Sequence, residues 1–100
     1  MKFLVITRPN GSKERHMHSA AEAAELGREV RRLHEEKVLE ASFAFIGGGS
    51  AYVLNADTTK QLAVLIRSNP LFSSQHHEII PVADAADFLE GLAEHLTANN

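Results

Sequence analysis

The first strand expected in this chain is apolar on both of its faces. The segment KFLVITR at 2–8 is short, rich in β-branched and aromatic residues, and followed by PNG, which is typical of a strand that ends in a turn. Side chains alternate between the two faces of a strand, so Phe3 and Val5 share one face while Leu4 and Ile6 share the other. A strand with one face in water would instead alternate apolar and polar residues. A sheet built on this segment must therefore be covered on both faces.

Three helices are predicted between and after the strands. The residues from Ser19 to Lys37 have helical periodicity, and Ser19 forms a capping box with Glu22. A second helix follows with Asp57 as its expected N-cap, and it ends at Asn69–Pro70. A third amphipathic helix is expected after its cap, Asp84.

Residues 38–56 predict two strands around a turn at Gly47–Gly49, because glycine adopts the positive φ that tight turns need. Residues 76–82 predict a fourth strand. The resulting order, βαββαβ plus a C-terminal helix, is that of a ferredoxin-like α+β fold with an antiparallel four-stranded sheet. One hundred residues correspond to a single domain, 1–100.

The two crossover helices of such a fold cover one face of the sheet. Apolar residues on the other face predict a further cover, because large bare apolar patches are rare on monomers. The third helix could cover part of this face, and a second copy of the sheet would cover it better. Two sheets packed face to face form a dimeric α+β barrel, so we expect a homodimer or a higher homo-oligomer.

Composition narrows the classes of function. The formal net charge is −3, which excludes the broad basic surface of a nucleic-acid-binding protein. The chain has no cysteine, so disulfides, iron–sulfur ligation and a thiol nucleophile are excluded. No segment has the length of a signal-peptide core or a membrane span. We therefore expect a cytoplasmic protein with neither a nucleic-acid nor a membrane partner.

The stretch GGGSAYVLNADTTKQLAVLIRSNPLF, followed by HHEIIPV, resembles the muconolactone isomerase-like members of the dimeric α+β barrel superfamily. The resemblance covers roughly the C-terminal half, including the NPLF exit at 69–72 and Glu78 in the last strand. It implies a compact cytoplasmic homo-oligomer with an active site in a pocket on each subunit's sheet. It also implies proton transfer on a small lactone without cofactor or metal. The family's second strand carries basic and aromatic polar residues, whereas here only Glu40 and Ser42 are polar in this strand.

Several histidines are candidates for the site. His76 and His77 are adjacent in a strand and point to opposite faces, so they cannot bind one metal ion together, and His76 shares its face with Glu78. His16 and His18 have the H-x-H spacing of metal ligands, but the same loop position suits solvated side chains or the lid of a pocket. We expect no metal site and no cofactor, and we retain His18 as a substrate-binding candidate.

A pocket is predicted beneath the first helix. Gly27 interrupts this helix at a cost of about 1 kcal/mol relative to alanine, and it lies seven residues before His34 on the stripe that faces the sheet. The missing side chain either lets the sheet approach closely or leaves a hole. A hole bordered by His34 would place an imidazole in a ligand pocket. Alternatively, His34 only closes the boundary of the helix.

Three further residues complete the candidate site. Tyr52 lies on an expected central strand, where its hydroxyl needs a partner. Glu78 suits a general base if it is half-buried, or it is an edge-strand charge that discourages aggregation. Arg8 could bind a substrate carboxylate, or it is a solvated strand end.

The leading hypothesis is a small cofactor-independent isomerase or lyase acting on a small lactone or carbonyl compound by proton transfer. The proton-transfer candidates are His34, His77 and Glu78, with Tyr52 or Arg8 stabilising the oxygen that gains charge. Gly27 and His18 would line the substrate pocket. The alternative is a non-catalytic domain that binds a small ligand or serves as an oligomeric scaffold. A cofactor-free oxygenase or a haem-binding barrel is a third possibility, disfavoured by the lack of tryptophan and of a clear axial ligand.

Overall fold

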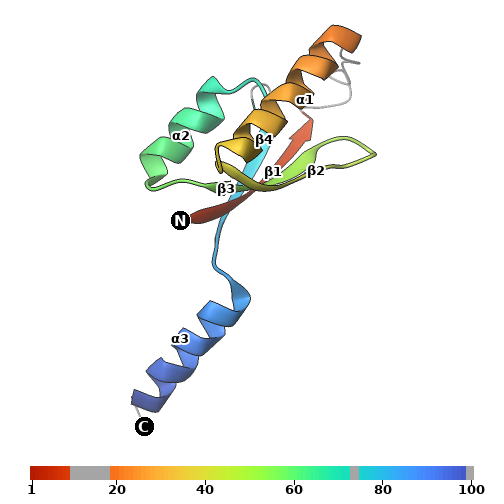
Figure 1. Ribbon diagram of the computed structural model, residues 1–100. Helices are drawn as coiled ribbons and strands as arrows, with labels where there is room; N and C mark the ends of the chain where they lie inside the picture. Colours follow the sequence, from red (N-terminus) through yellow and green to blue (C-terminus); the bar gives the residue numbers. More distant parts are fainter. Residues whose placement is uncertain (10–18, 73–74, 99–100) are drawn as a thin grey trace.

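Four strands form one antiparallel open sheet in the order β2-β3-β1-β4 (Figure 1). The computed structural model describes residues 1–9, 19–72 and 75–98. Its elements, in chain order, are β1 (Lys2–Pro9), α1 (Ala20–Glu35), β2 (Leu39–Ala44), β3 (Ser50–Asn55), α2 (Thr59–Ser68), β4 (Gln75–Val82) and α3 (Ala85–Ala98). The prediction of an α+β chain with this sheet is confirmed, and the strand order fits a ferredoxin-like arrangement.

Side-chain caps fix where α1 and α2 begin. Ser19 caps α1 as predicted, since its hydroxyl accepts a hydrogen bond from the backbone N–H of Glu22 at 3.2 Å. The prediction that Asp57 caps α2 is wrong. Thr58 is the cap, because its extended backbone lets the hydroxyl accept from the N–H of Gln61 at 3.1 Å. Asp57 lies one residue earlier, and its own N–H donates to the Gln61 side chain at 2.9 Å.

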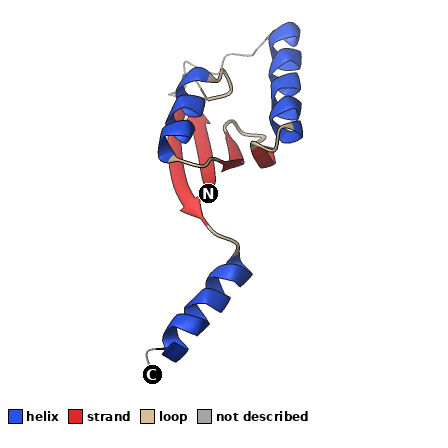
Figure 2. Ribbon diagram, turned by 60° about the vertical axis from the view of Figure 1, so that its left-hand side comes forward, coloured by secondary structure: helices blue, strands red, loops and turns tan. Residues whose placement is uncertain are grey.

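The core lies between the two crossover helices and one face of the sheet (Figure 2). The side chains of Phe3 and Val5 from β1 and of Leu54 from β3 are buried on this covered face. Leu33 of α1 and Ile66 of α2 pack against them, as the helical periodicity predicts. The turn between α2 and β4 closes the core with two further buried apolar residues, Leu71 and Phe72.

The other face of the sheet, here called the open face, is apolar at its centre, and none of the three described helices lies on it. Leu4 of β1 stands opposite Val53 of β3 and Ile80 of β4, and Ile6 stands opposite Ala51. Leu4, Ile6, Ala51 and Val53 are only partly buried, and Ile80 is exposed. The prediction that both faces of the strands are apolar is therefore confirmed.

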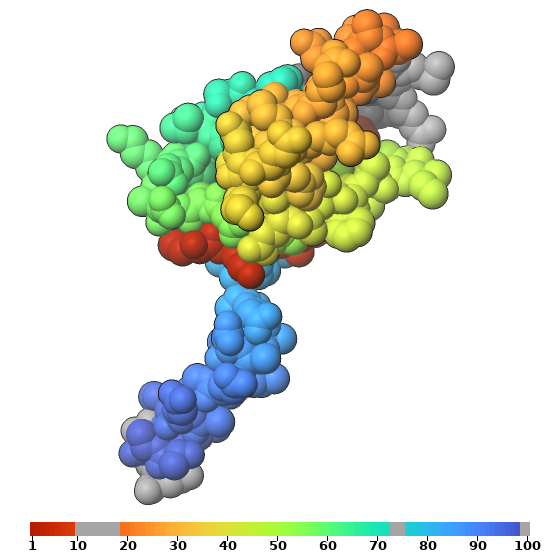
Figure 3. All heavy atoms as spheres, in the orientation of Figure 1, coloured from red at the N-terminus to blue at the C-terminus, as the bar shows by residue number. Residues whose placement is uncertain are grey.

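Helix α3 projects away from the rest of the chain (Figures 1 and 3). Asp84 caps it as predicted, since its carboxylate accepts from the N–H of Asp87 at 3.1 Å. No residue described in α3 is buried, and the projecting helix gives the chain an extent of 59 Å along its longest axis. Within one chain, α3 therefore covers none of the open face, although the sequence allowed it to cover part.

Candidate functional site

A row of polar side chains crosses the covered face of the sheet. Thr7 of β1 stands opposite Ser50 of β3 and opposite His77 of β4. Thr7 and Ser50 are both buried, and their hydroxyl oxygens are 2.6 Å apart. A buried hydroxyl pair is satisfied only while both members are present. Sequence reasoning missed these two residues, although Thr7 continues the alternation that places Phe3 and Val5 on the covered face.

The imidazole of His77 is held in one orientation by the turn that precedes β4. Its Nε2 lies 2.5 Å from the carbonyl oxygen of Phe72. A carbonyl oxygen only accepts hydrogen bonds, so Nε2 must carry a hydrogen. In the neutral ring, Nδ1 then has the free lone pair and can accept a proton. The ring of Phe72 also packs edge-on against Tyr52, with centroids 5.1 Å apart, so His77 and Tyr52 flank the same phenylalanine.

His34 joins α1 to the sheet. Its Nε2 lies 2.8 Å from the hydroxyl oxygen of Ser42 on β2, and the side chain is half-buried. Ser42 stands opposite Tyr52 in the strand register, so His34 lies over the covered face as expected. The structure thus brings His34, His77 and Tyr52 to one side of the sheet, whereas their chemical roles stay predictions.

Glu78 and Arg8 lie on the opposite side. Glu78 stands opposite Ile6, and Arg8 stands opposite His76, both on the open face. Both side chains are exposed. The sheet therefore separates these two candidates from His34, His77 and Tyr52, and one copy of the chain does not combine them in a single site. His18, like His16, lies outside the described residues.

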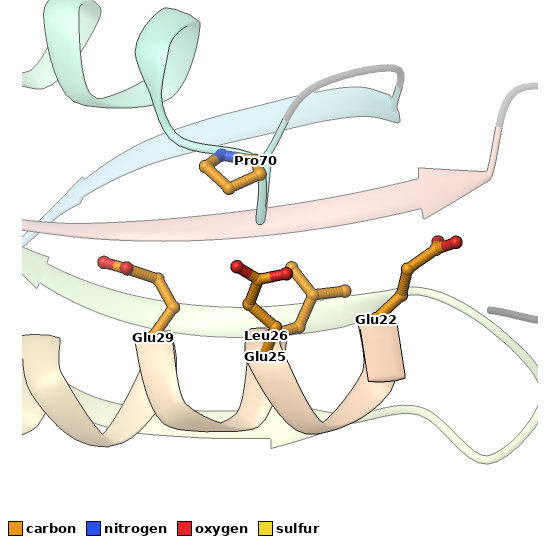
Figure 4. A pocket seen from close by; sticks show the side chains of 5 residues that line it. All are labelled: Glu22, Glu25, Leu26, Glu29 and Pro70. Carbon is orange, nitrogen blue, oxygen red and sulfur yellow. The ribbon is translucent and has the colours of Figure 1, made fainter. Parts of the chain in front are cut away.

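A shallow cavity of about 340 Å³ opens beside α1 (Figure 4). Pro70 lies on one side of it, and side chains of α1 reach toward Pro70 from the other, namely Glu22, Glu25, Leu26 and Glu29. We call it the acidic groove. Neither Gly27 nor His34 lines it, which corrects the predicted pocket. Each helical residue turns about 100° from the last, so Leu26 faces Pro70 while Gly27 is exposed beside it.

Apart from the neighbours of Gly27 in the chain and the backbone of its own helix, no described atom lies within 4 Å of the position that a Cβ atom at Gly27 would occupy. The alternative in which the sheet packs closely against this glycine is therefore wrong. The space next to Gly27 is open and not enclosed, since the Gly27 backbone itself is exposed.

Hydrogen bonds hold Glu29, one of the residues that line the acidic groove, in place. The hydrogen bond from the Arg32 guanidinium is the main reason that the pKa of Glu29 lies below its usual value, and burial opposes this effect. The amide of Asn69 adds a weaker contact, with its nitrogen 3.4 Å from a Glu29 oxygen. Asn69 is buried and also accepts a hydrogen bond from the N–H of Leu71 at 3.0 Å. The described residues that line the groove thus include three glutamates, of which Glu29 is paired with Arg32.

Among the described residues, no group of three or more histidine, aspartate and glutamate side chains could hold a metal ion. None of the helices in that part of the chain is both long and apolar enough to cross a membrane. Comparison with protein-family models and with curated proteins finds no match.

Proposed function

We propose that this chain is a small cofactor-independent enzyme of the isomerase or lyase type, similar to the muconolactone isomerase-like proteins, that moves a proton on a small carbonyl compound. The observation that carries the proposal is the fixed imidazole of His77. Its Nε2–H is committed to the Phe72 carbonyl, which leaves Nδ1 as the proton acceptor.

In the proposed reaction, Nδ1 of neutral His77 takes a proton from the carbon next to the carbonyl group. The electron pair of that C–H bond moves toward the carbonyl oxygen, which gains negative charge. Tyr52, on the same face, is the group we assign to donate a hydrogen bond to this oxygen. In an unsaturated substrate, the electron pair then returns from the oxygen through the adjacent C=C bond, and the imidazolium protonates the far carbon of that bond. The double bond shifts along the substrate, so the isomerisation needs no external oxidant or reductant.

The acidic groove is distinct from the proposed acid–base pair, because neither His77 nor Tyr52 is among its described lining residues. His77 and Tyr52 lie on the covered face beside buried apolar residues, where a charge is costly to bury. We therefore propose an uncharged, unsaturated lactone or ketone as the substrate.

The test is exchange of substrate hydrogen for deuterium in heavy water, followed by NMR with uncharged unsaturated lactones and ketones. His77→Gln keeps an amide donor for the Phe72 carbonyl but removes the base, so exchange should fall about 100-fold or more. His76→Gln is the matched control, because His76 is the neighbouring residue on the opposite face. Equal losses in both variants, or full activity in His77→Gln, would contradict the proposal.

A second candidate function is a non-catalytic oligomeric scaffold, which the bare open face and the uncovered α3 favour. In either case we propose a homodimer or a higher homo-oligomer, of which the dimeric α+β barrel is one form. We also propose a cytoplasmic setting, which the absence of cysteine from the sequence fits. A scaffold would form the oligomer and show no deuterium exchange above background with any carbonyl compound tested.

A further inference from the structure

Helix α3 carries an apolar stripe that no described residue of its own chain covers. Phe88, Leu89 and Leu96 are 62%, 60% and 55% exposed, and Leu92 lies between them on the same side of the helix. The opposite side carries Asp87, Glu90 and Glu94. A helix with one apolar and one charged side is stable when the apolar side is buried and the charged side stays in water.

The open face of the sheet is the second uncovered apolar surface. Its centre is formed by Leu4, Ile6, Val53 and Ile80, and its margin includes Phe43, which is 64% exposed. This surface and the stripe of α3 have the same apolar character, and each lacks a partner among the described residues.

The connection between the two surfaces directs α3 away from its own sheet. Only Ala83 and Asp84 separate β4 from α3, and Asp84 already caps the helix through its side chain and through its carbonyl, which accepts from the N–H of Phe88 at 2.9 Å. A reversal onto the open face of the same chain would need a tight turn within two residues, neither of them glycine. In all three overall views α3 instead extends beyond the sheet (Figures 1–3).

We propose that α3 of one chain docks through its apolar stripe on the open face of a second copy, and that the second copy returns the same contact. A two-fold symmetric pair has self-complementary interfaces, so one exchange of helices covers both apolar surfaces of both chains. A second copy supplies a matching apolar surface for each of the two, its open face for the stripe of α3 and its own stripe for the open face. A helix together with one face of a four-stranded sheet also has the scale of a stable interface, which involves about 20–30 residues on each side.

The distribution of charge on α3 determines which side of the helix faces the sheet. The acidic side of α3 would be costly to bury, so it remains in water when the apolar stripe is on the sheet. Sheet-on-sheet packing alone would cover the open face but leave the stripe of α3 bare. This proposal specifies the homodimer proposed above and does not depend on the proposed catalysis.

Disulfide cross-linking tests this proposal. The native chain has no cysteine, so each introduced cysteine is the only thiol in its chain. Leu92→Cys on the apolar stripe and Val53→Cys on the open face are made as separate proteins, one with a mass tag. The two are unfolded together, refolded as a mixture, oxidised mildly and run on a non-reducing gel. Glu94→Cys, on the charged side of α3, replaces Leu92→Cys as the matched control. Circular dichroism checks folding, and Ile80→Cys replaces Val53→Cys if the latter fails to fold.

The expected result is a covalent pair that contains one tagged and one untagged chain. It should form about tenfold more often with Leu92→Cys than with Glu94→Cys, because a disulfide requires Cα atoms within about 7 Å. A yield no higher than that of the control would overturn the helix exchange, and a dimer by light scattering would then leave only the homodimer proposal standing. A double variant, Leu92→Cys with Val53→Cys, that closes a disulfide within one chain would also overturn it, since α3 would then cover its own sheet.

Discussion

At the scale of single residues, two glycines show opposite reasons for lacking a side chain. Gly27 lies inside α1, and outside its own helix backbone no described atom would lie within 4 Å of an added Cβ, so alanine should fit there without a clash. Gly49 has a φ of 94°, and its Cβ would lie 2.5 Å from the carbonyl oxygen of Thr7. Only the second position requires glycine for the fold.

We therefore expect Gly27→Ala to raise the free energy of unfolding by about 1 kcal/mol, through helix propensity alone. Gly49→Ala should lower it, because the backbone would be strained and Thr7 displaced. Urea denaturation of the two variants measures both changes. A loss of stability in Gly27→Ala would mean that a further surface packs against α1 at this point.

The carboxylate of Glu29 provides a prediction on pH. Its pKa is lowered in the folded chain, mainly by the hydrogen bond from Arg32, so its contribution to stability is present above the unfolded-state value near 4.5 and is lost as the pH falls through the folded-state value. Arg32→Gln should raise the pKa of Glu29 and weaken this loss of stability at acid pH. Arg31→Gln, which removes the same charge one residue away, should leave the pKa in place. Carboxyl NMR titration distinguishes the two, and equal titration curves in both variants would contradict the assignment to Arg32.

Some features of single site residues were predictable from the sequence, and others were not. Alternation along β4 correctly separated His77 from Glu78, because it depends only on strand geometry. The bond from His77 to Phe72 was not predictable, since it depends on how the turn at 69–72 folds back on β4. Thr7 was missed because threonine is common in strands and its buried partner, Ser50, is 43 positions away in sequence.

At the scale of elements, the hydroxyl pair of Thr7 and Ser50 links β1 to β3 inside the core. Removing one hydroxyl leaves the other buried without its partner, so Thr7→Val or Ser50→Ala should each cost about 1–3 kcal/mol. The double variant leaves no buried hydroxyl unpaired and should cost clearly less than the sum of the single changes. Urea denaturation of the four proteins gives the coupling energy. Additive losses would show that the two hydroxyls do not depend on each other.

The boundaries of the elements followed the local signals in the sequence wherever those signals were unambiguous. Ser19 and Asp84 were identified as caps because each precedes an amphipathic run. At α2 two possible caps, Asp57 and Thr58, are adjacent, and only the backbone geometry at Thr58 decides between them. The direction of α3 relative to the sheet was not predicted, because the sequence left open whether α3 turns back onto its own sheet after the short connection at Ala83 and Asp84.

At the scale of the whole molecule, the alternation of side chains that predicted the strands also predicted an apolar surface on both faces of the sheet. The two crossover helices cover only one of these faces. Phe3 and Val5 are buried beneath the helices, as expected, while Leu4 and Ile6 remain half-exposed on the other side. The sequence therefore predicted the covered and the open face correctly, but not that α3 would add another uncovered surface. We propose that an assembly of more than one chain covers both surfaces, since large bare apolar patches are rare on monomers.

Association should therefore depend on the open face. We expect the chain to have a mass in light scattering of at least twice 11.0 kDa at micromolar concentration. Val53→Asp should reduce it to 11.0 kDa, because the side chain points away from the core and a charge in an apolar interface is costly to bury.

Val64→Asp is the matched control for this change. It places the same charge on the exposed side of α2, where Val64 is 57% exposed, and it should leave the assembly intact. Salt at molar concentration should not dissociate the native assembly, because apolar burial is not screened as ion pairs are. If Val53→Asp keeps the mass of the native protein while its circular dichroism is unchanged, the chains associate through another surface. If the native chain is itself a monomer, neither the homodimer nor the exchange of α3 can hold.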